Sequence, residues 1–180
     1  KNYSQLKTWQ GDFGIKYTNR NAISLRKLDG LYLKNFGVTR TVLNNLFIGK
    51  FNRNIKILEV GCNVGNQLLL LQEMGFKDLY GIEINSYAVE FLKARSKGIN
   101  IVHNSAFDIP FKDGYFDLVF TSGVLIHIHP KNIKKALSEI YRCAKKYIWG
   151  YEYYSGDYTE VPYRRQRGLL WKADFAKIYT

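Results

Sequence analysis

The 180-residue sequence has few of the residues that mark specialised protein classes. Its only cysteines are Cys62 and Cys143, and neither belongs to a Cys-x-x-Cys or Cys/His cluster. This argues against a disulfide framework or a zinc site and predicts a reducing, cytoplasmic location. With three prolines and no low-complexity tract, the chain offers no candidate linker. The longest uncharged apolar stretch, Gly123 to Ile128, is too short to span a bilayer, and no secretory signal is visible.

Acidic residues are also scarce, since 15 Asp and Glu stand against 27 Lys and Arg, for a net charge of +12. Three interpretations compete for this excess. The chain could bind nucleic acid, it could bind an anionic small substrate such as a nucleotide sugar, or it could come from a lysine-rich proteome. Many of the lysines are scattered along the sequence, so charge alone does not decide between them.

Short apolar strands alternate with helix-like segments from residue 55 onward, which predicts βαβ units and an α/β fold. We expect a Rossmann-like, doubly wound, mostly parallel sheet with helices on both faces. A single domain, 1–180, would comprise an N-terminal helical cap or lid (1–50) and the core (51–180). The expected strands are 55–60, 78–84, 99–103, 115–121 and 147–154, and the expected helices are 20–28, 39–47, 66–74, 87–96, 131–145 and 169–179.

The strongest motif is LEVGCNVGNQ, Leu58 to Gln67, between an expected strand and an expected helix. Gly61 allows a tight turn at the strand end, and Gly65 lets the backbone approach a ligand at the helix N-terminus. Glu83 ends the next strand, eighteen residues after Gly65. An acidic side chain at that position can accept both ribose hydroxyls of an adenosine ligand.

These residues resemble the class I S-adenosylmethionine-dependent methyltransferases, whose first motif is usually acidic-x-Gly-x-Gly-x-Gly. Glu59, Gly61 and Gly65 match it, and Asn63 stands where the central glycine usually is. The resemblance implies S-adenosylmethionine as cofactor, with the glycine loop facing its methionine part and Glu83 on the ribose. The further cofactor contacts that it implies are Ile84 at the end of the second strand, Ser105 and Ala106 at the adenine, and Thr121, Ser122 and Gly123 beside the sulfonium.

The segment WQGDFGIKYTNRN, Trp9 to Asn21, together with TSGVLIHIHP and GLLWKADFAKIY, resembles the methylases associated with pseudaminic acid biosynthesis. That resemblance places Tyr17 and Arg20 in a lid over the cofactor, with Arg20 a candidate partner for its carboxylate. Members of this family usually finish the sheet with a β-hairpin, which nothing after Tyr179 supplies. We therefore expect further residues beyond Thr180 in the native protein.

Methyl transfer to a hydroxyl requires a base near the sulfonium. His127, after the fourth strand, and Glu152, at the end of the fifth, are the candidate catalytic residues. For the acceptor, we single out two aromatic and two basic side chains on the same rim: Tyr151, Tyr153, Arg164 and Arg165. The sequence has no Asp/Asn cluster that would indicate a required metal ion.

The leading hypothesis is an enzyme that methylates a hydroxyl, or less favourably an amine, of a sugar or nucleotide sugar in surface polysaccharide biosynthesis. An RNA methyltransferase is the second hypothesis, supported by the charge but by no recognisable RNA-binding module. A non-catalytic, cofactor-binding regulator or subunit is the third. The oligomeric state is left open.

Overall fold

The computed structural model describes residues 4–179. Five parallel strands form the central sheet in the order β3-β2-β1-β4-β5, and a two-stranded antiparallel sheet pairs β6 with β7. The elements in chain order are α1 (Ser4–Gln10), α2 (Asp12–Asn21), α3 (Leu25–Phe36), α4 (Arg40–Phe47), β1 (Lys56–Val60), α5 (Asn66–Glu73), β2 (Asp78–Glu83), α6 (Ser86–Arg95), β3 (Ile99–His103), β4 (Phe116–Ser122), the 3₁₀ turn η1 (Leu125–His127), α7 (Pro130–Cys143), β5 (Ala144–Tyr151), β6 (Thr159–Glu160), β7 (Trp171–Lys172) and α8 (Phe175–Ile178).

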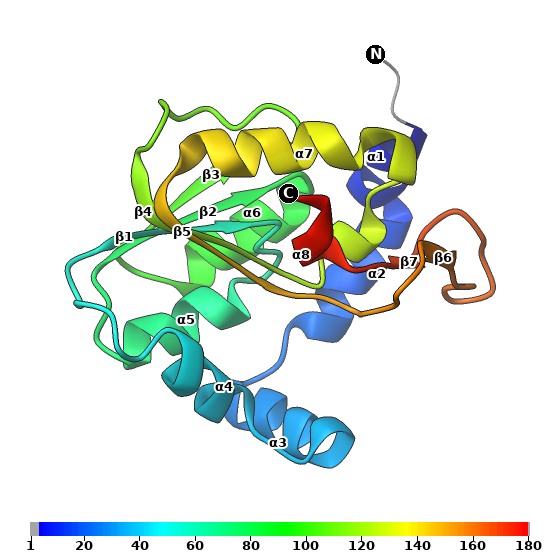
Figure 1. The fold of residues 1–180 in the computed structure, drawn as a ribbon. Coiled ribbons are helices and arrows are strands. Elements are labelled where there is room, and N and C mark those ends of the chain that lie inside the picture. The colour runs from blue at the N-terminus through cyan, green and yellow to red at the C-terminus, as the bar shows by residue number, and fades with distance from the viewer. Residues whose placement is uncertain (1–3, 180) are drawn as a thin grey trace.

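Helices cover both faces of the large sheet, as the sequence predicts (Figure 1). On one face α7 buries Ile133, Leu137 and Ile140 in a cluster with apolar residues of β1 and β4. On the other face, Leu68 and Leu71 of α5 pack with Leu92 of α6. The Rossmann-like α/β fold is therefore confirmed. Because β2 and β4 flank β1 on opposite sides, the strand order reverses at β1, and ligands bind at the carboxyl ends of strands at such a switch point.

The N-terminal helices differ from the prediction. The expected helix over 20–28 is wrong, because the chain breaks between α2 and α3, where the Ser24 hydroxyl accepts a hydrogen bond from the Lys27 N–H and starts a new helix. The helix expected over 39–47 is confirmed, with Thr39 as its N-cap. In Figure 1, α1 lies beside the start of α7, whereas α3 and α4 lie beside α5.

Two predictions near the C-terminus are corrected. The fifth strand ends at Tyr151, so Glu152 follows it instead of closing it. The helix expected over 169–179 is also wrong, because Trp171 and Lys172 pair with Glu160 and Thr159 as short strands. Only α8 is helical there, and the Asp174 carboxylate caps it by accepting from the Lys177 N–H. Within residues 4–179 we find no helix that is long and apolar enough to cross a membrane.

Candidate active site

A cavity of about 260 Å³ opens at the carboxyl ends of β1, β2 and β4, where the strand order reverses. Side chains or backbone from α1 and α2 close one side of it, and Leu28 and Tyr32 of α3 extend the wall. The cavity brings together ten of the residues predicted to bind the cofactor: Tyr17, Glu59, Gly61, Asn63, Glu83, Ile84, Ser105, Ala106, Ser122 and Gly123. The candidate base His127 lines it as well.

The glycine loop turns between β1 and α5 through three residues with left-handed backbone. Gly61, Asn63 and Gly65 have φ of 72°, 45° and 71°. Gly65 is the N-cap of α5, where a Cβ would collide with the Leu92 side chain. It does not line the cavity. Its contribution is thus to allow the close approach of the loop to α6.

Glu83 is the centre of the hydrogen bonding in this loop. Its Oε2 accepts the backbone N–H of Asn63, and its Oε1 accepts that of Asn85, each at 2.8 Å. Burial raises the pKa of Glu83, although these backbone donors and a further one act in the opposite direction. Each carboxylate oxygen has a further lone pair, so the two bonds leave acceptor capacity for ligand hydroxyls.

Three buried polar atoms that lack a hydrogen-bond partner within residues 4–179 belong to residues of this cavity. They are Glu59 Oε2, Asn63 Oδ1 and Trp9 Nε1, two acceptors and one donor. Burial also raises the pKa of Glu59 well above its ordinary value, and the nearby Arg40 guanidinium opposes this shift. Because unpartnered buried polar atoms are costly, their concentration at one cavity indicates that a polar ligand completes them.

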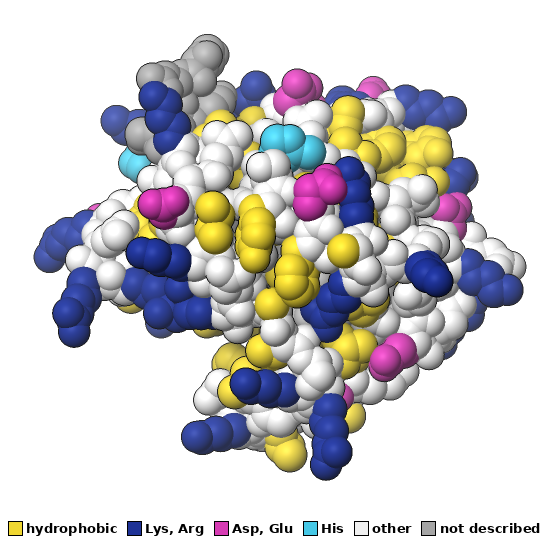
Figure 2. All heavy atoms as spheres, turned by 180° about the vertical axis from the view of Figure 1, so that it is seen from behind, with side chains coloured by type: hydrophobic (Ala, Val, Ile, Leu, Met, Phe, Trp, Pro, Cys, Tyr) yellow, Lys and Arg dark blue, Asp and Glu magenta, His cyan; other side chains and the backbone are white. Residues whose placement is uncertain are grey.

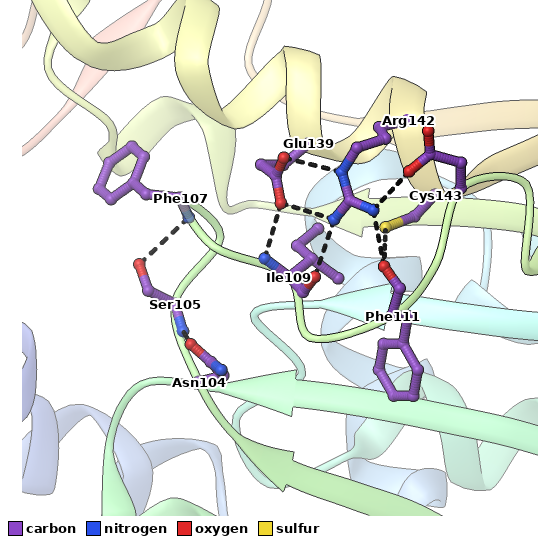
Figure 3. A network of polar contacts seen from close by, with 9 residues as sticks. Asn104, Ser105, Phe107, Ile109, Phe111, Glu139, Arg142 and Cys143 are labelled. Atoms are coloured by element: carbon purple, nitrogen blue, oxygen red, sulfur yellow. Dashed lines mark hydrogen bonds and ion pairs between the residues drawn. The ribbon is translucent and has the colours of Figure 1, made fainter.

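The residues expected to contact adenine lie in a short loop after β3. The Asn104 Oδ1 accepts the Ser105 N–H at 2.6 Å, and the Ser105 hydroxyl accepts the Phe107 N–H at 3.2 Å. Figure 3 shows that this loop continues into a second network centred on Arg142 of α7. Ser105 therefore shapes the loop through its hydroxyl, and the structure adds Asn104 to the cavity wall.

Arg142 holds the continuation of that loop against α7 (Figure 3). Its guanidinium donates to the carbonyl oxygens of Ile109 and Phe111 at 2.8 and 2.6 Å, and it forms ion pairs with Asp113 and Glu139. The Glu139 carboxylate in turn accepts the Ile109 N–H at 2.8 Å, and its hydrogen bond with Arg142 lowers its pKa. This network fixes the path of the chain directly after the predicted adenine contacts.

His127 lies in an aromatic cluster at the cavity wall. Its ring centroid is 4.5 Å from that of Trp9 and 5.2 Å from that of Tyr163. The Nδ1 atom is 2.7 Å from the carbonyl oxygen of Leu169, which can only accept, so Nδ1 carries a proton. Burial lowers the pKa of His127 to about 4, against a smaller opposite effect of the Leu169 hydrogen bond. The neutral ring thus presents Nε2 as an unprotonated acceptor, and within residues 4–179 no hydrogen bond reaches it.

Glu152 lies on the far side of the loop that follows β4. It accepts hydrogen bonds from the backbone N–H groups of Val124 and Ile126 at 3.1 and 3.4 Å. It lines a second cavity, of about 480 Å³, together with Thr121. Burial raises its pKa to about 7. Glu152 therefore holds the backbone of Val124 and Ile126, and the structure does not bring the side chain of Glu152 or Thr121 into the first cavity.

The structure also leaves the remaining predicted residues outside the first cavity. Arg20 is exposed, with its guanidinium 5.7 Å from the Tyr17 ring centroid. Tyr151 packs against the guanidinium of Arg40, and Tyr153 is exposed. Arg164 and Arg165 are exposed in the turn between Tyr163 and Gln166, where both have positive φ.

Several residues that matter for the site were not among the predicted contacts. Gln5 of α1 donates to the carbonyl oxygens of His127 and Gly168, which fastens the first helix to the cavity wall. Arg40 is fully buried between the rings of Tyr151 and Trp149, at 4.7 and 5.1 Å from their centroids. The aromatic residues of WQGDFGIKYT were a sequence signal that could have predicted the lid. No sequence signal predicts the burial of Arg40, because an arginine beside a helix N-cap is ordinarily exposed on the surface.

Comparisons with known proteins agree with this geometry. A family model described as a methyltransferase domain matches residues 58–147. A curated relative, the phosphoethanolamine N-methyltransferase of Plasmodium falciparum, is 25% identical over 79% of this chain and 57% of its own length. The chain thus spans only part of the curated relatives that it matches, 57% and 41% of the first two.

Two solved structures show the same fold. An S-adenosylmethionine-dependent methyltransferase from Archaeoglobus fulgidus is 25% identical, with a TM-score of 0.52 over 74% of this chain and 58% of its own. A protein from Pyrococcus horikoshii is 18% identical, with a TM-score of 0.60 over 99% of this chain and 87% of its own. The second similarity extends over the N-terminal helices as well as the sheet.

Proposed function

The chain belongs to the methyltransferase-domain family, the class I S-adenosylmethionine-dependent methyltransferases, and we propose that it methylates a small anionic acceptor with His127 as the base. The methylated atom is a hydroxyl oxygen or an amine nitrogen of that acceptor. The observation that carries the proposal is the neutral, Nδ1-protonated His127 at the wall of the cavity that also holds the cofactor residues.

The residues of the cavity fit S-adenosylmethionine. The unpartnered Glu59 Oε2 and Asn63 Oδ1 offer acceptors to a cationic amine, and Glu83 has lone pairs for ribose hydroxyls. When bound, the cofactor supplies an electrophilic methyl group on a sulfonium. We assign the contacts with it to the ten predicted residues that line the cavity, with Thr121 and Gly65 acting through the backbone that they shape.

His127 would act on the acceptor in a single displacement. As the bond from the acceptor oxygen or nitrogen to the methyl carbon forms and the carbon–sulfur bond breaks, Nε2 takes the proton that the acceptor loses. The hydrogen bond from Nδ1 to Leu169 and the packing against Trp9 hold the ring in one orientation. The unpartnered Trp9 N–H, in the same wall, is available to an oxygen of the acceptor.

The anionic character of the acceptor is proposed from the rim of the site. Tyr163 packs against His127, and the Arg164 guanidinium is 5.7 Å from the Tyr163 ring centroid. A phosphate or carboxylate at Arg164 and Arg165 would thus belong to an acceptor whose other end reaches His127. Nucleotide sugars, as in surface polysaccharide biosynthesis, and phosphorylated amines, as for the Plasmodium relative, both have this chemistry.

RNA is the alternative acceptor, and the net charge of +12 is the observation that favours it. Figure 2 shows Lys and Arg side chains in separate groups on one face, with hydrophobic and acidic side chains between them. On this face the basic groups do not form the continuous surface that typically tracks a nucleic acid backbone. We therefore rank a small acceptor first.

The test is a panel of acceptors incubated with the purified protein and S-adenosylmethionine, read as formation of S-adenosylhomocysteine. The panel contains nucleotide sugars, phosphoethanolamine and total RNA, with His127→Asn as the control variant. Turnover of one of the small anions that falls about 100-fold or more in the variant supports the proposal. Turnover of RNA alone, or equal turnover by the variant, would overturn it.

A further inference from the structure

Asn63 replaces the central glycine of the usual motif, yet its backbone keeps the left-handed conformation, with φ of 45°. The side chain of Asn63 therefore projects from a turn that ordinarily has none. Its Nδ2 donates to the hydroxyl oxygen of Thr18 at 3.0 Å, and Thr18 is fully buried in α2. The substitution thus gives the glycine loop a direct hydrogen bond to the helix that covers the cavity.

The other end of the same amide is unsatisfied. Asn63 Oδ1 is buried and has no hydrogen-bond partner within residues 4–179, and Asn63 lines the cofactor cavity. Glu59 Oε2, from the end of β1, is a second unpartnered acceptor of the same cavity. Two acceptors call for a donor with several N–H groups, and an ammonium carries three. The α-ammonium is the donor of this kind in S-adenosylmethionine.

We propose that the Asn63 side chain couples the cofactor to the lid, because its oxygen accepts from the cofactor's α-ammonium while its nitrogen holds α2 through Thr18. The amide then has both of its ends satisfied only when cofactor and α2 are in place together. This inference rests on the cofactor alone and is independent of the acceptor.

The lid has other anchors, so the Asn63 bond can be removed without releasing α2. The Tyr87 hydroxyl donates to the Asn19 Oδ1 of α2 at 2.9 Å, and the Asn66 Nδ2 donates to the carbonyl oxygen of Asn21 at 3.0 Å. Glycine adopts a φ of 45° more readily than asparagine does, so Asn63→Gly removes the side chain while relieving the backbone. This variant restores the residue that the motif usually has, and we expect it to fold.

The first measurement is calorimetric binding of S-adenosylhomocysteine and of 5′-methylthioadenosine, which lacks the amino acid portion. For Asn63→Gly we expect roughly 10-fold or more weaker binding of S-adenosylhomocysteine, because a hydrogen bond to a charged group is lost. Binding of 5′-methylthioadenosine should change by less than about 3-fold. Asn63→Asp keeps an acceptor for the ammonium, and the Thr18 hydroxyl can donate to its second oxygen, so this variant should retain S-adenosylhomocysteine affinity within about 3-fold.

Three results would overturn the contact to the ammonium. They are unchanged S-adenosylhomocysteine binding by Asn63→Gly, equal losses for both ligands, and a loss in Asn63→Asp as large as that in the glycine variant.

Coupling to the lid is tested with Thr18→Val, which removes only the hydroxyl partner. In the S-adenosylhomocysteine complex, we expect faster amide hydrogen exchange across α2 in this variant. Adding Thr18→Val to Asn63→Gly should cost little further affinity, because the two residues act through one interaction. Fully additive losses, or unchanged exchange in α2, would contradict the coupling.

Discussion

Replacing Glu83 by glutamine tests the cofactor site without any knowledge of the acceptor. The carboxylate accepts two backbone N–H groups at 2.8 Å, and glutamine keeps one acceptor oxygen while turning an amide NH₂ toward the other donor. The ribose hydroxyls also lose a charged acceptor, and such a bond contributes about 1.5–3 kcal/mol. We therefore expect the Kd of S-adenosylhomocysteine to rise about 10- to 150-fold.

The unfolding free energy of the apo protein should fall by less than the binding free energy of S-adenosylhomocysteine. One backbone N–H is left without its acceptor, at a cost of about 1–3 kcal/mol in unfolding free energy. Because burial raises the pKa of Glu83, removal of the buried charge offsets part of that cost. Calorimetry with S-adenosylhomocysteine and denaturant unfolding of the apo protein give the two quantities separately.

Asp117→Asn is the matched control. The Asp117 carboxylate also accepts a backbone N–H, that of Lys56 at 3.0 Å, but at the opposite edge of the sheet. We expect this variant to bind S-adenosylhomocysteine within about twofold of the wild type. The reasoning is refuted if Glu83→Gln binds as tightly as the wild type, or if the Asp117 variant loses as much.

Three further predictions concern neighbouring groups. Because burial lowers the pKa of His127 to about 4, kcat/KM measured from pH 8 to pH 5 should show no loss from its protonation; a protonation limb near pH 6.5 would contradict this. The folded-state pKa of Glu152 is raised from 4.5 to about 7, so the stability it contributes is present below pH 4.5 and lost as the pH rises to about 7. Urea unfolding at several pH values should show this slope in the wild type and not in Glu152→Gln; equal slopes would exclude it. In Arg142→Lys, the lysine cannot reach all the carbonyls and carboxylates that Arg142 bonds in Figure 3. Unfolding in guanidinium chloride should therefore show a decrease of about 1–3 kcal/mol in unfolding free energy; an unchanged midpoint would argue against the network.

The sequence predicted the parts of the site that depend on local geometry. Gly61, Asn63 and Gly65 predict a left-handed turn between strand and helix, and Glu83 follows at the end of the next parallel strand. Parallel strands place their carboxyl ends at one edge of the sheet, so these residues meet whatever the details of packing. The position of His127 at the cavity wall was predicted for the same reason, since it follows β4 closely.

The predictions that failed depend on contacts between distant segments. Residues 169–179 have a helical pattern, but Trp171 pairs with Glu160 across a long connection, and tertiary pairing overrides a local preference of that size. The fifth strand was expected to extend to residue 154 with Glu152 near its end. It stops at Tyr151, and the Glu152 carboxylate accepts hydrogen bonds from the amides of Val124 and Ile126.

By itself, then, the sequence determined the class of fold and the left-handed loop between β1 and α5, because periodicity and backbone conformation are properties of adjacent residues. Its resemblance to the class I methyltransferases supplied the cofactor. Only the tertiary structure decided which polar groups have hydrogen-bond partners within the protein and which have none. It showed that Glu152 is occupied by backbone donors, and that Asn63 and Trp9 each keep one buried polar atom without a partner within residues 4–179. Burial and hydrogen bonding across the fold set that difference, and no pattern along the chain records it.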